Sequence, residues 1–269
     1  MATQLIVVCT LLLSVLICGV NAQGGPSGTD YVRMAEDFNK RLERDNAVIY
    51  YEKAAVEFQA AGNAEQFVNS YNQIGIILTR QDKYERARGY LDKALSTGLS
   101  SLGTDHLSVA TTYLSLGVVD AAENKFDDSL QQHDKALKIR LSKLGKFSAE
   151  AATSYGNIGN VHFRRMEYNR AIEAHRAAKQ IRAKVFGENS VQIVESYFNL
   201  GNAYREKKSY KRSLRYFEMA LRNKIAQLGE GHKDLIRHYR SLSQAYSLIG
   251  NKRKADELKK KSDEIENLP

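Results

Sequence analysis

Glycine recurs along this chain at a constant interval of 42 residues. Gly75, Gly117, Gly159 and Gly201 share the interval, and the next step falls on Ser243. A constant interval over most of a sequence is typical of stacked repeats, in which each unit buries its apolar face only against its neighbours. The sequence therefore predicts a one-dimensional solenoid whose wall is an extended binding surface.

Other positions keep the same interval and divide each repeat into two helices. A tyrosine stands four residues before each step, and small residues follow it at twelve and nineteen residues, within apolar stripes of helical period. Small residues let two antiparallel helices approach closely while aromatic side chains fill the space between them. Each repeat is therefore predicted as helix–turn–helix. The tyrosines are Tyr71, Tyr113, Tyr155, Tyr197 and Tyr239, and the small residues are Ala87, Ser129, Ala171, Ser213 and Ala255, then Ala94, Ala136, Ala178, Ala220 and Ser262.

One further copy of the pattern precedes these repeats with a step of 40, in which Tyr31 and Ala35 correspond to Tyr71 and Gly75. Terminal repeats of a solenoid are atypical because one face meets water, and alanine in place of glycine fits this expectation. Six helical pairs are predicted in a solenoid over residues 31–269. Their bounds are about 31–70, 71–112, 113–154, 155–196, 197–238 and 239–267.

The pattern resembles the tetratricopeptide repeat (TPR) family, and Leu200-Gly201-Asn202-Ala203-Tyr204 is its closest local match. The usual unit has about 34 residues and a proline after the second helix. This chain departs on both points, with a longer unit and no proline between Pro26 and Pro269. The long unit is similar to the repeats of kinesin light chains and Pins-type adaptors. The resemblance implies an all-α, right-handed α-solenoid that acts as a binding scaffold.

The first 22 residues carry no charge, and Leu5–Val20 is a weakly polar to apolar run. Val20-Asn21-Ala22 supplies small residues where a signal peptidase reads, so we expect a signal peptide over residues 1–22, cleavage before Gln23 and secretion. Sixteen residues fall short of the ~20 that span a bilayer. An uncleaved anchor, retention in the secretory lumen and a lipoprotein modified at Cys18 are the alternatives.

Both cysteines, Cys9 and Cys18, lie in this leader, so the mature chain has no disulfide framework. A chain of this length buries enough core without one. Residues 23–30 are predicted as a short flexible linker, with Asp30 as the N-cap of the first helix.

In TPR solenoids the first helix of each repeat lines a concave groove, and the resemblance assigns groove positions here. Several are carboxamides, which donate and accept hydrogen bonds simultaneously and suit a peptide backbone. Neighbouring arginines prefer carboxylates. We therefore expect an extended, acidic peptide as partner, with ordinary solvated helix faces as the alternative. The candidate peptide-binding residues are Asn72, Arg80, Asn160, Arg164, Asn202, Arg205, Arg240 and Gln244.

The formal net charge of +9 at pH 7 is concentrated in the turns of the last three repeats. Equivalent turns stack along one edge of a solenoid, so these cations form a basic strip. The basic strip predicts an extracellular matrix component that binds a sulfated glycan or another polyanion. The alternative is an edge whose charge only keeps the protein soluble. Nucleic acid is not expected, because no DNA- or RNA-binding module is present. The candidate residues are Arg165, Lys207, Lys208, Lys211, Arg212, Lys252, Arg253 and Lys254.

Catalytic motifs are absent from the sequence: there is no metalloprotease helix, no nucleophile elbow and no phosphate loop. His133 and His175 share one repeat position, and Asp120 and His162 share another. Apolar residues hold these positions in other repeats, so core pairs, Asp120–His162 or His133–His175, are favoured over metal ligands. We expect a monomeric or weakly self-associating scaffold with no enzyme activity, no cofactor, no bound metal and no membrane span after cleavage.

Overall fold

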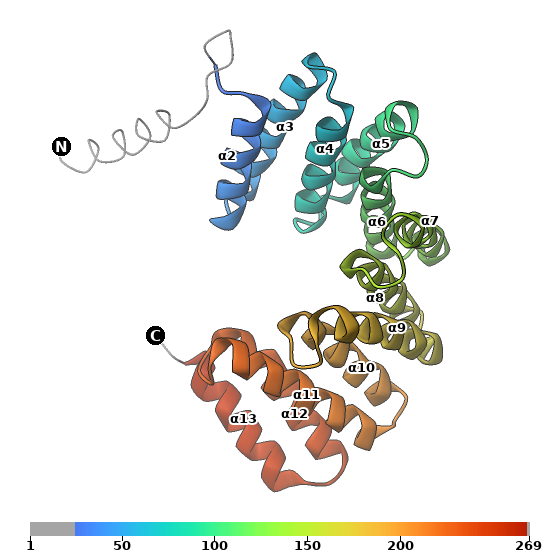
Figure 1. Cartoon of the computed structure of the whole chain (residues 1–269). Helices are drawn as coiled ribbons and strands as arrows, with labels where there is room; N and C mark the ends of the chain where they lie inside the picture. The colour runs from blue at the N-terminus through green and yellow to red at the C-terminus, as the bar shows by residue number, and fades with distance from the viewer. Residues whose placement is uncertain (1–24, 268–269) are drawn as a thin grey trace, which may run out of the picture. The chain divides into compact units, whose positions relative to one another are not determined.

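The computed structural model describes residues 25–267, which form α-helices joined by short turns and two 3-10 segments (Figure 1). The predicted all-α architecture of repeated helix–turn–helix pairs is confirmed. The chain divides into two compact units between Glu123 and Asn124, inside the third repeat. The predicted leader and its cleavage site lie outside the described residues.

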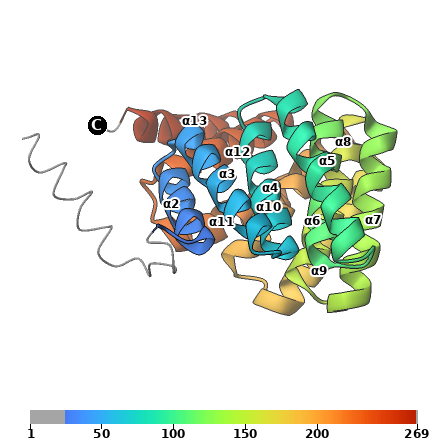
Figure 2. The same ribbon diagram turned by 90° about the horizontal axis from the view of Figure 1, so that it is seen from above.

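Unit 1 contains the helices of the first two repeats and the first helix of the third. Each helix packs against the next along the chain, and α4 also contacts α6 (Figures 1 and 2). The helices are α2 (Gly28–Lys40), α3 (Arg44–Ala60), α4 (Ala64–Thr79), α5 (Tyr84–Ser101) and α6 (Leu107–Ala122).

Unit 2 contains the remaining seven helices of the described chain, again packed in sequence order. In its last two repeats a single 3-10 turn precedes the first helix. The elements are α7 (Phe126–Leu144), α8 (Ala149–Arg164), α9 (Tyr168–Phe186), η1 (Val191–Ile193), α10 (Val194–Glu206), α11 (Tyr210–Leu228), η2 (Lys233–Leu235), α12 (Ile236–Leu248) and α13 (Lys252–Glu266).

The helical pairs begin earlier than the repeat bounds drawn from the tyrosines. Tyr71 lies in the middle of α4, because the first helix of the repeat starts at Ala64. The predicted N-cap of the first helix is also wrong. Ser27 is the N-cap of α2, and its hydroxyl accepts a hydrogen bond from the Asp30 amide, while the Asp30 carboxylate accepts one from the Ser27 amide. This reciprocal capping box draws residues 28–30, predicted as linker, into the helix.

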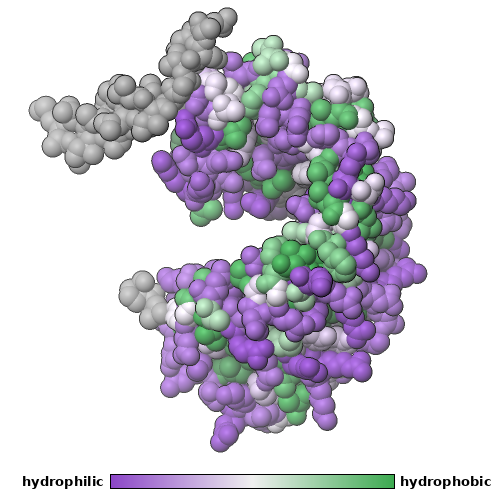
Figure 3. Space-filling model, in the orientation of Figure 1, coloured by the Kyte–Doolittle hydropathy of each residue, from purple (hydrophilic) through white to green (hydrophobic). Residues whose placement is uncertain are grey.

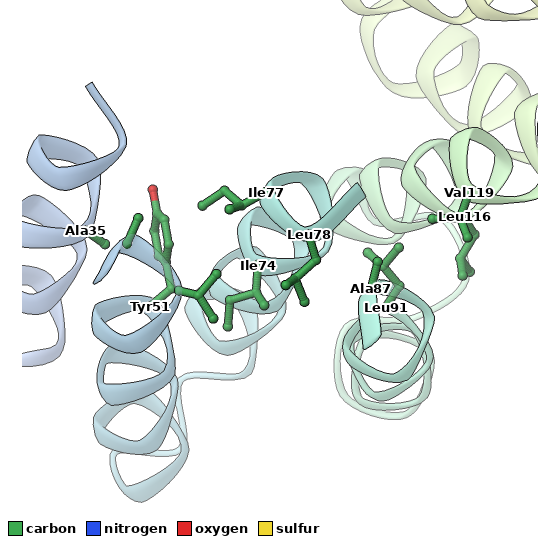
Figure 4. Packing of buried hydrophobic residues seen from close by; sticks show 11 residues of the cluster. Ala35, Tyr51, Ile74, Ile77, Leu78, Ala87, Leu91, Leu116 and Val119 are labelled. Atoms are coloured by element: carbon green, nitrogen blue, oxygen red, sulfur yellow. The ribbon is translucent and has the colours of Figure 1, made fainter. Parts of the chain in front are cut away.

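The core of unit 1 alternates large and small residues across the helix pairs. Ile74 and Leu78 of α4 lie between Tyr51 of α3 and Leu91 of α5, and all four are at most 4% exposed (Figure 4). Burying one such side chain stabilises the fold by about 1.5–3 kcal/mol. Ala87 has no exposed surface, and its small side chain lets α5 lie close to α4.

At three of its positions the recurring glycine marks a close approach of the two helices in a repeat. A Cβ added at Gly75 would lie 2.5 Å from Leu91 Cδ2, and one added at Gly201 would lie 2.6 Å from Phe217 Cδ1. At Gly159 the facing ring is that of His175, also at 2.6 Å. These distances leave no room for a methyl group, so the backbone of the first helix itself forms the wall of the pocket for the bulky residue.

Replacing Gly201 by alanine tests this contact. Overpacking costs about 1–3 kcal/mol, which exceeds the gain of about 1 kcal/mol from alanine's helix propensity. Gly201→Ala is therefore expected to lower the free energy of unfolding in a denaturant titration. Gly89 is the matched control, because it lies in α5 with no heavy atom within 4 Å of its added Cβ, so Gly89→Ala is expected to stabilise. Stabilisation by both substitutions would refute the close approach.

The turns inside the repeats share one residue with positive φ. Leu42, Met166 and Lys208 have φ of 64°, 62° and 59°, and Gly250 holds the same place in the last repeat with 83°. Side chains other than glycine and asparagine are disfavoured in this conformation by about 1–2 kcal/mol. Leu42 and Met166 are also 73% exposed, so these two turns combine backbone strain with an apolar side chain in water.

Candidate functional site

Polar side chains form a connected row on the first helices of unit 2. The Asn199 side-chain amide of α10 donates to Asn160 Oδ1 of α8 at 3.3 Å, and Arg205 of α10 donates to Gln244 Oε1 of α12 at 2.9 Å. Asn202 lies between Asn199 and Arg205 at spacings of three residues, which places all three on one face of α10. We call Asn160, Asn199, Asn202, Arg205 and Gln244 the polar ladder.

The other predicted peptide-binding residues have different surroundings. Asn72 is buried, with 1% exposure, and its amide donates to the Ser108 carbonyl at 3.1 Å, so its assignment to an open groove is corrected. Arg80 is exposed at the end of α4 in unit 1. Arg164 donates to Asn124 Oδ1 and stacks on Phe126, and Arg240 pairs with Glu266 at 2.6 Å.

Sequence reasoning missed Asn199 in the polar ladder and two arginines between repeats, of which Arg140 is buried and Arg182 is partly buried. Arg140 donates to Ser154 Oγ at 3.0 Å, and Arg182 donates to Ser196 Oγ at 2.6 Å. Burial lowers the pKa of both guanidinium groups. The two arginines are 42 residues apart, and so are the two serines. This shared interval in the sequence could have identified both pairs. Their hydrogen bonds join one repeat to the next.

The predicted basic edge lies on the turns of unit 2, and part of its charge is already paired. Arg165 pairs with Asp127 at 2.5 Å and with Glu167 at 3.2 Å, and Lys254 pairs with Glu257 at 2.9 Å. The pKa of Glu167 is lowered, first by its hydrogen bond with His162 and then by nearby cations. These pairs hold the side chains in place and reduce the net charge of the edge.

Four cations of the edge make no ion pair within the described residues. All four are exposed, and they lie at or just before the N-terminal ends of α11 and α13, which are the second helices of the last two repeats. Arg212 instead stacks on the Tyr204 ring, 5.7 Å from its centroid, and Lys207 donates to Asn169 Oδ1. The basic edge thus keeps a net positive potential. The four cations are Lys208, Lys211, Lys252 and Arg253.

His133 and His175 are buried in the core, as predicted, with 1% and 2% exposure, but no hydrogen bond between the two rings is found among the described residues. The Nδ1 atom of each has no hydrogen-bond partner among the described residues, and burial lowers the pKa of each imidazole to about 4. Asp120 and His162, predicted as a pair, each have a partner within their own unit. Asp120 pairs with Arg88 at 2.7 Å, and the His162 ring bonds with Glu167 at 2.6 Å.

The two buried imidazoles are expected to make the fold acid-sensitive. Their folded pKa of about 4 lies below the ordinary value of 6.5, so the unfolded chain binds more protons between these pH values. Stability is therefore lost as the pH falls from 6.5 to 4. Since Phe217 holds the same repeat position, His175→Phe is expected to fit and to reduce the loss by about 3 kcal/mol at most. Chemical denaturation at pH 7 and pH 4 measures the difference.

His232 supplies the control for this comparison. It is an exposed histidine whose ring caps η2, a role that asparagine can also fill, so His232→Asn is expected to keep the wild-type pH dependence. Parallel stability curves for wild type and His175→Phe would contradict the assignment of acid sensitivity to the buried ring.

Neither a membrane-spanning helix nor a metal cluster was found in the described part of the chain. From residue 25 to residue 267, no helix is long and apolar enough to cross a bilayer. Over the same residues, no three histidine, cysteine or acidic side chains gather at metal-binding distance.

The tetratricopeptide repeat model matches residues 66–142 and 150–226, which are more than half of the sequence. The chain therefore belongs to the tetratricopeptide repeat family. Members of this family are typically non-catalytic scaffolds for protein or peptide partners, and their stacked repeats provide the extended surface for that role. No curated protein matches the sequence.

Solved structures share the fold at low sequence identity. BtubC (BKLC) from P. vanneervenii superposes with a TM-score of 0.70 at 19% identity, covering 88% of this chain and 91% of that protein. A kinesin light chain protein of P. anserina with nearly identical TPR-like repeats gives 0.64 at 16% identity, with coverage of 74% and 94%. The apo form of RapI gives 0.60 at 15%, with coverage of 89% and 97%. Identities this low establish the fold alone.

Proposed function

We propose that unit 2 is a scaffold that binds an extended acidic peptide along the polar ladder. The observation that carries this proposal is the position of Asn202. Its neighbours Asn199 and Arg205 on α10 reach in opposite directions, to α8 and to α12, while the side-chain amide of Asn202 makes no hydrogen bond within the described chain. Its amide retains both donor and acceptor capacity at the centre of the row.

The polar ladder has groups that can bind both the backbone and the acidic side chains of a peptide. A carboxamide can pair with the N–H and C=O of an extended backbone without regard to sequence. Arg205, partly exposed, is balanced by Glu206 at 3.1 Å, and its guanidinium still has donors for a second carboxylate. Arg164 adds positive charge on α8, whereas the charge of Arg240 on α12 is balanced by Glu266. These features favour acidic side chains in the partner.

Binding of a fluorescent peptide of alternating glutamate and alanine tests the proposal. Loss of one neutral hydrogen bond costs about 0.5–1.5 kcal/mol and loss of a charged one about 1.5–3 kcal/mol. Asn202→Ala is therefore expected to weaken binding several-fold and Arg205→Ala more than tenfold. The triple change of Asn160, Asn202 and Arg205 to alanine is expected to abolish binding, as measured by fluorescence anisotropy.

Gln180→Ala is the matched control, because Gln180 is an exposed carboxamide on the second helix α9. It is expected to leave the affinity unchanged. Unaltered binding by the triple variant would sink the proposal, and equal binding of a peptide with lysine in place of glutamate would remove the acidic preference.

We further propose that this scaffold acts in the secretory pathway or outside the cell. The support is the uncharged, apolar leader of residues 1–22 with small residues before Gln23. N-terminal sequencing of the native protein from medium and from cells tests it. A chain that starts at Gln23 in the medium is the expected result, and an intact Met1 confined to the cytosol would contradict the proposal.

A further inference from the structure

The basic edge of unit 2 carries exposed apolar side chains as well as charge. Met166, after α8, is 73% exposed, and Leu248 and Ile249, at the end of α12, are 42% and 40% exposed. On the face shown in Figure 3, hydrophilic residues predominate and hydrophobic ones form smaller groups. An apolar side chain that is exposed in a turn contributes little burial energy to the fold. Packing therefore does not explain why these three side chains lie among cations.

Met166 is held in its exposed position at a cost. Its φ of 62° is disfavoured for a side chain with a Cβ, whereas glycine holds the equivalent place in the last repeat. Together with Lys207 and Arg170 it lines a shallow surface depression. Because Leu42 in unit 1 has the same φ and exposure, the feature that distinguishes Met166 is its position on the basic edge.

Hydrogen bonds between repeats bring the three turns side by side. Lys207, in the turn after α10, donates to Asn169 at the start of α9. Arg205, one turn of helix away from Lys208, donates to Gln244 near the end of α12. Met166, the unpaired Lys208 and Ile249 therefore follow one another along a single edge.

We propose that the basic edge docks on an anionic phospholipid surface. Met166, Leu248 and Ile249 enter the boundary between headgroups and acyl chains, while Lys208, Lys211, Lys252 and Arg253 bind the lipid phosphates and carboxylates. Apolar side chains ringed by lysine and arginine are the pattern of peripheral membrane binding. A sulfated glycan would satisfy the cations and leave the three apolar side chains in water.

Co-sedimentation with phosphatidylcholine vesicles, with and without phosphatidylserine, tests the proposal on the full-length chain. Any contribution of residues 1–22 is common to wild type and variants. Binding is expected to require phosphatidylserine. Lys208→Glu with Lys211→Glu is expected to weaken it by about thirtyfold or more, since each cation near an anionic surface contributes about fivefold.

The apolar part of the edge is tested by Met166→Asn with Ile249→Asn, which is expected to weaken binding about tenfold or more. Asparagine tolerates the positive φ of Met166, and Ile249 has an ordinary φ of −96° and is 40% exposed, so this pair keeps the fold, and an unchanged or raised melting temperature verifies it. Leu42→Asn is the matched control, because Leu42 has the same exposure and φ but lies in unit 1, outside the basic edge, where Arg41 and Arg44 are accompanied by Glu43 and Asp45. It is expected to leave vesicle binding unchanged.

Lys138→Glu with Lys184→Glu makes the same charge change on exposed lysines of α7 and α9, away from the turns, and is expected to have a smaller effect than the edge pair. Equal loss from both lysine pairs would overturn a specific edge. Binding that is insensitive to the apolar pair, or that occurs with heparin and not with vesicles, would overturn the membrane surface in favour of a glycan.

Discussion

The closest contact in three of the repeats is between a glycine backbone, at Gly75, Gly159 or Gly201, and one bulky side chain, and the other packing features accommodate it. Because Gly75 and Gly201 leave no space for a Cβ, Leu91 and Phe217 can reach the axis of the pair and be buried completely. The small residues of the second helix keep the helices at that separation. A solenoid can vary its bulky residue, from leucine to histidine to phenylalanine, only because the facing wall is backbone.

Because of this constraint, residue type is restricted at the positions where helices pack and is free to vary at the exposed positions, where a function can arise. The glycine, the bulky residue and the small residues recur in most repeats, whereas the turns and the exposed face of each first helix do not. Charge is consequently free to differ between repeats, and it accumulates at Lys208, Lys211, Lys252 and Arg253 in unit 2. The functional surfaces are therefore sought where the repeats differ.

The interval of 42 residues was sufficient to predict the helical pairs and the buried histidines, because repeat positions inherit each other's environment. The interval did not show where each helix begins, since a tyrosine that recurs at one repeat position can lie in the middle of a helix as well as at its start. Asn72 was assigned to a groove by its register, yet in unit 1 that register faces Ser108 of the next repeat. Partners such as Arg88 for Asp120 depend on side-chain reach between repeats, which no single-sequence pattern encodes.

The polar ladder and the basic edge respond differently to salt, although both favour negative charge. The edge acts through exposed cations, whose attraction is screened beyond about 8–10 Å at physiological ionic strength. The carboxamides of Asn160 and Asn202 act through hydrogen bonds at contact distance, which screening hardly affects. Arg205 brings one charge to the ladder at the end of α10, and it is paired with Glu206. A ligand held by several cations of the edge would be lost steeply with salt, whereas one that engages Asn202 and the single charge of Arg205 would keep most of its affinity, so salt dependence separates the two surfaces without any substitution.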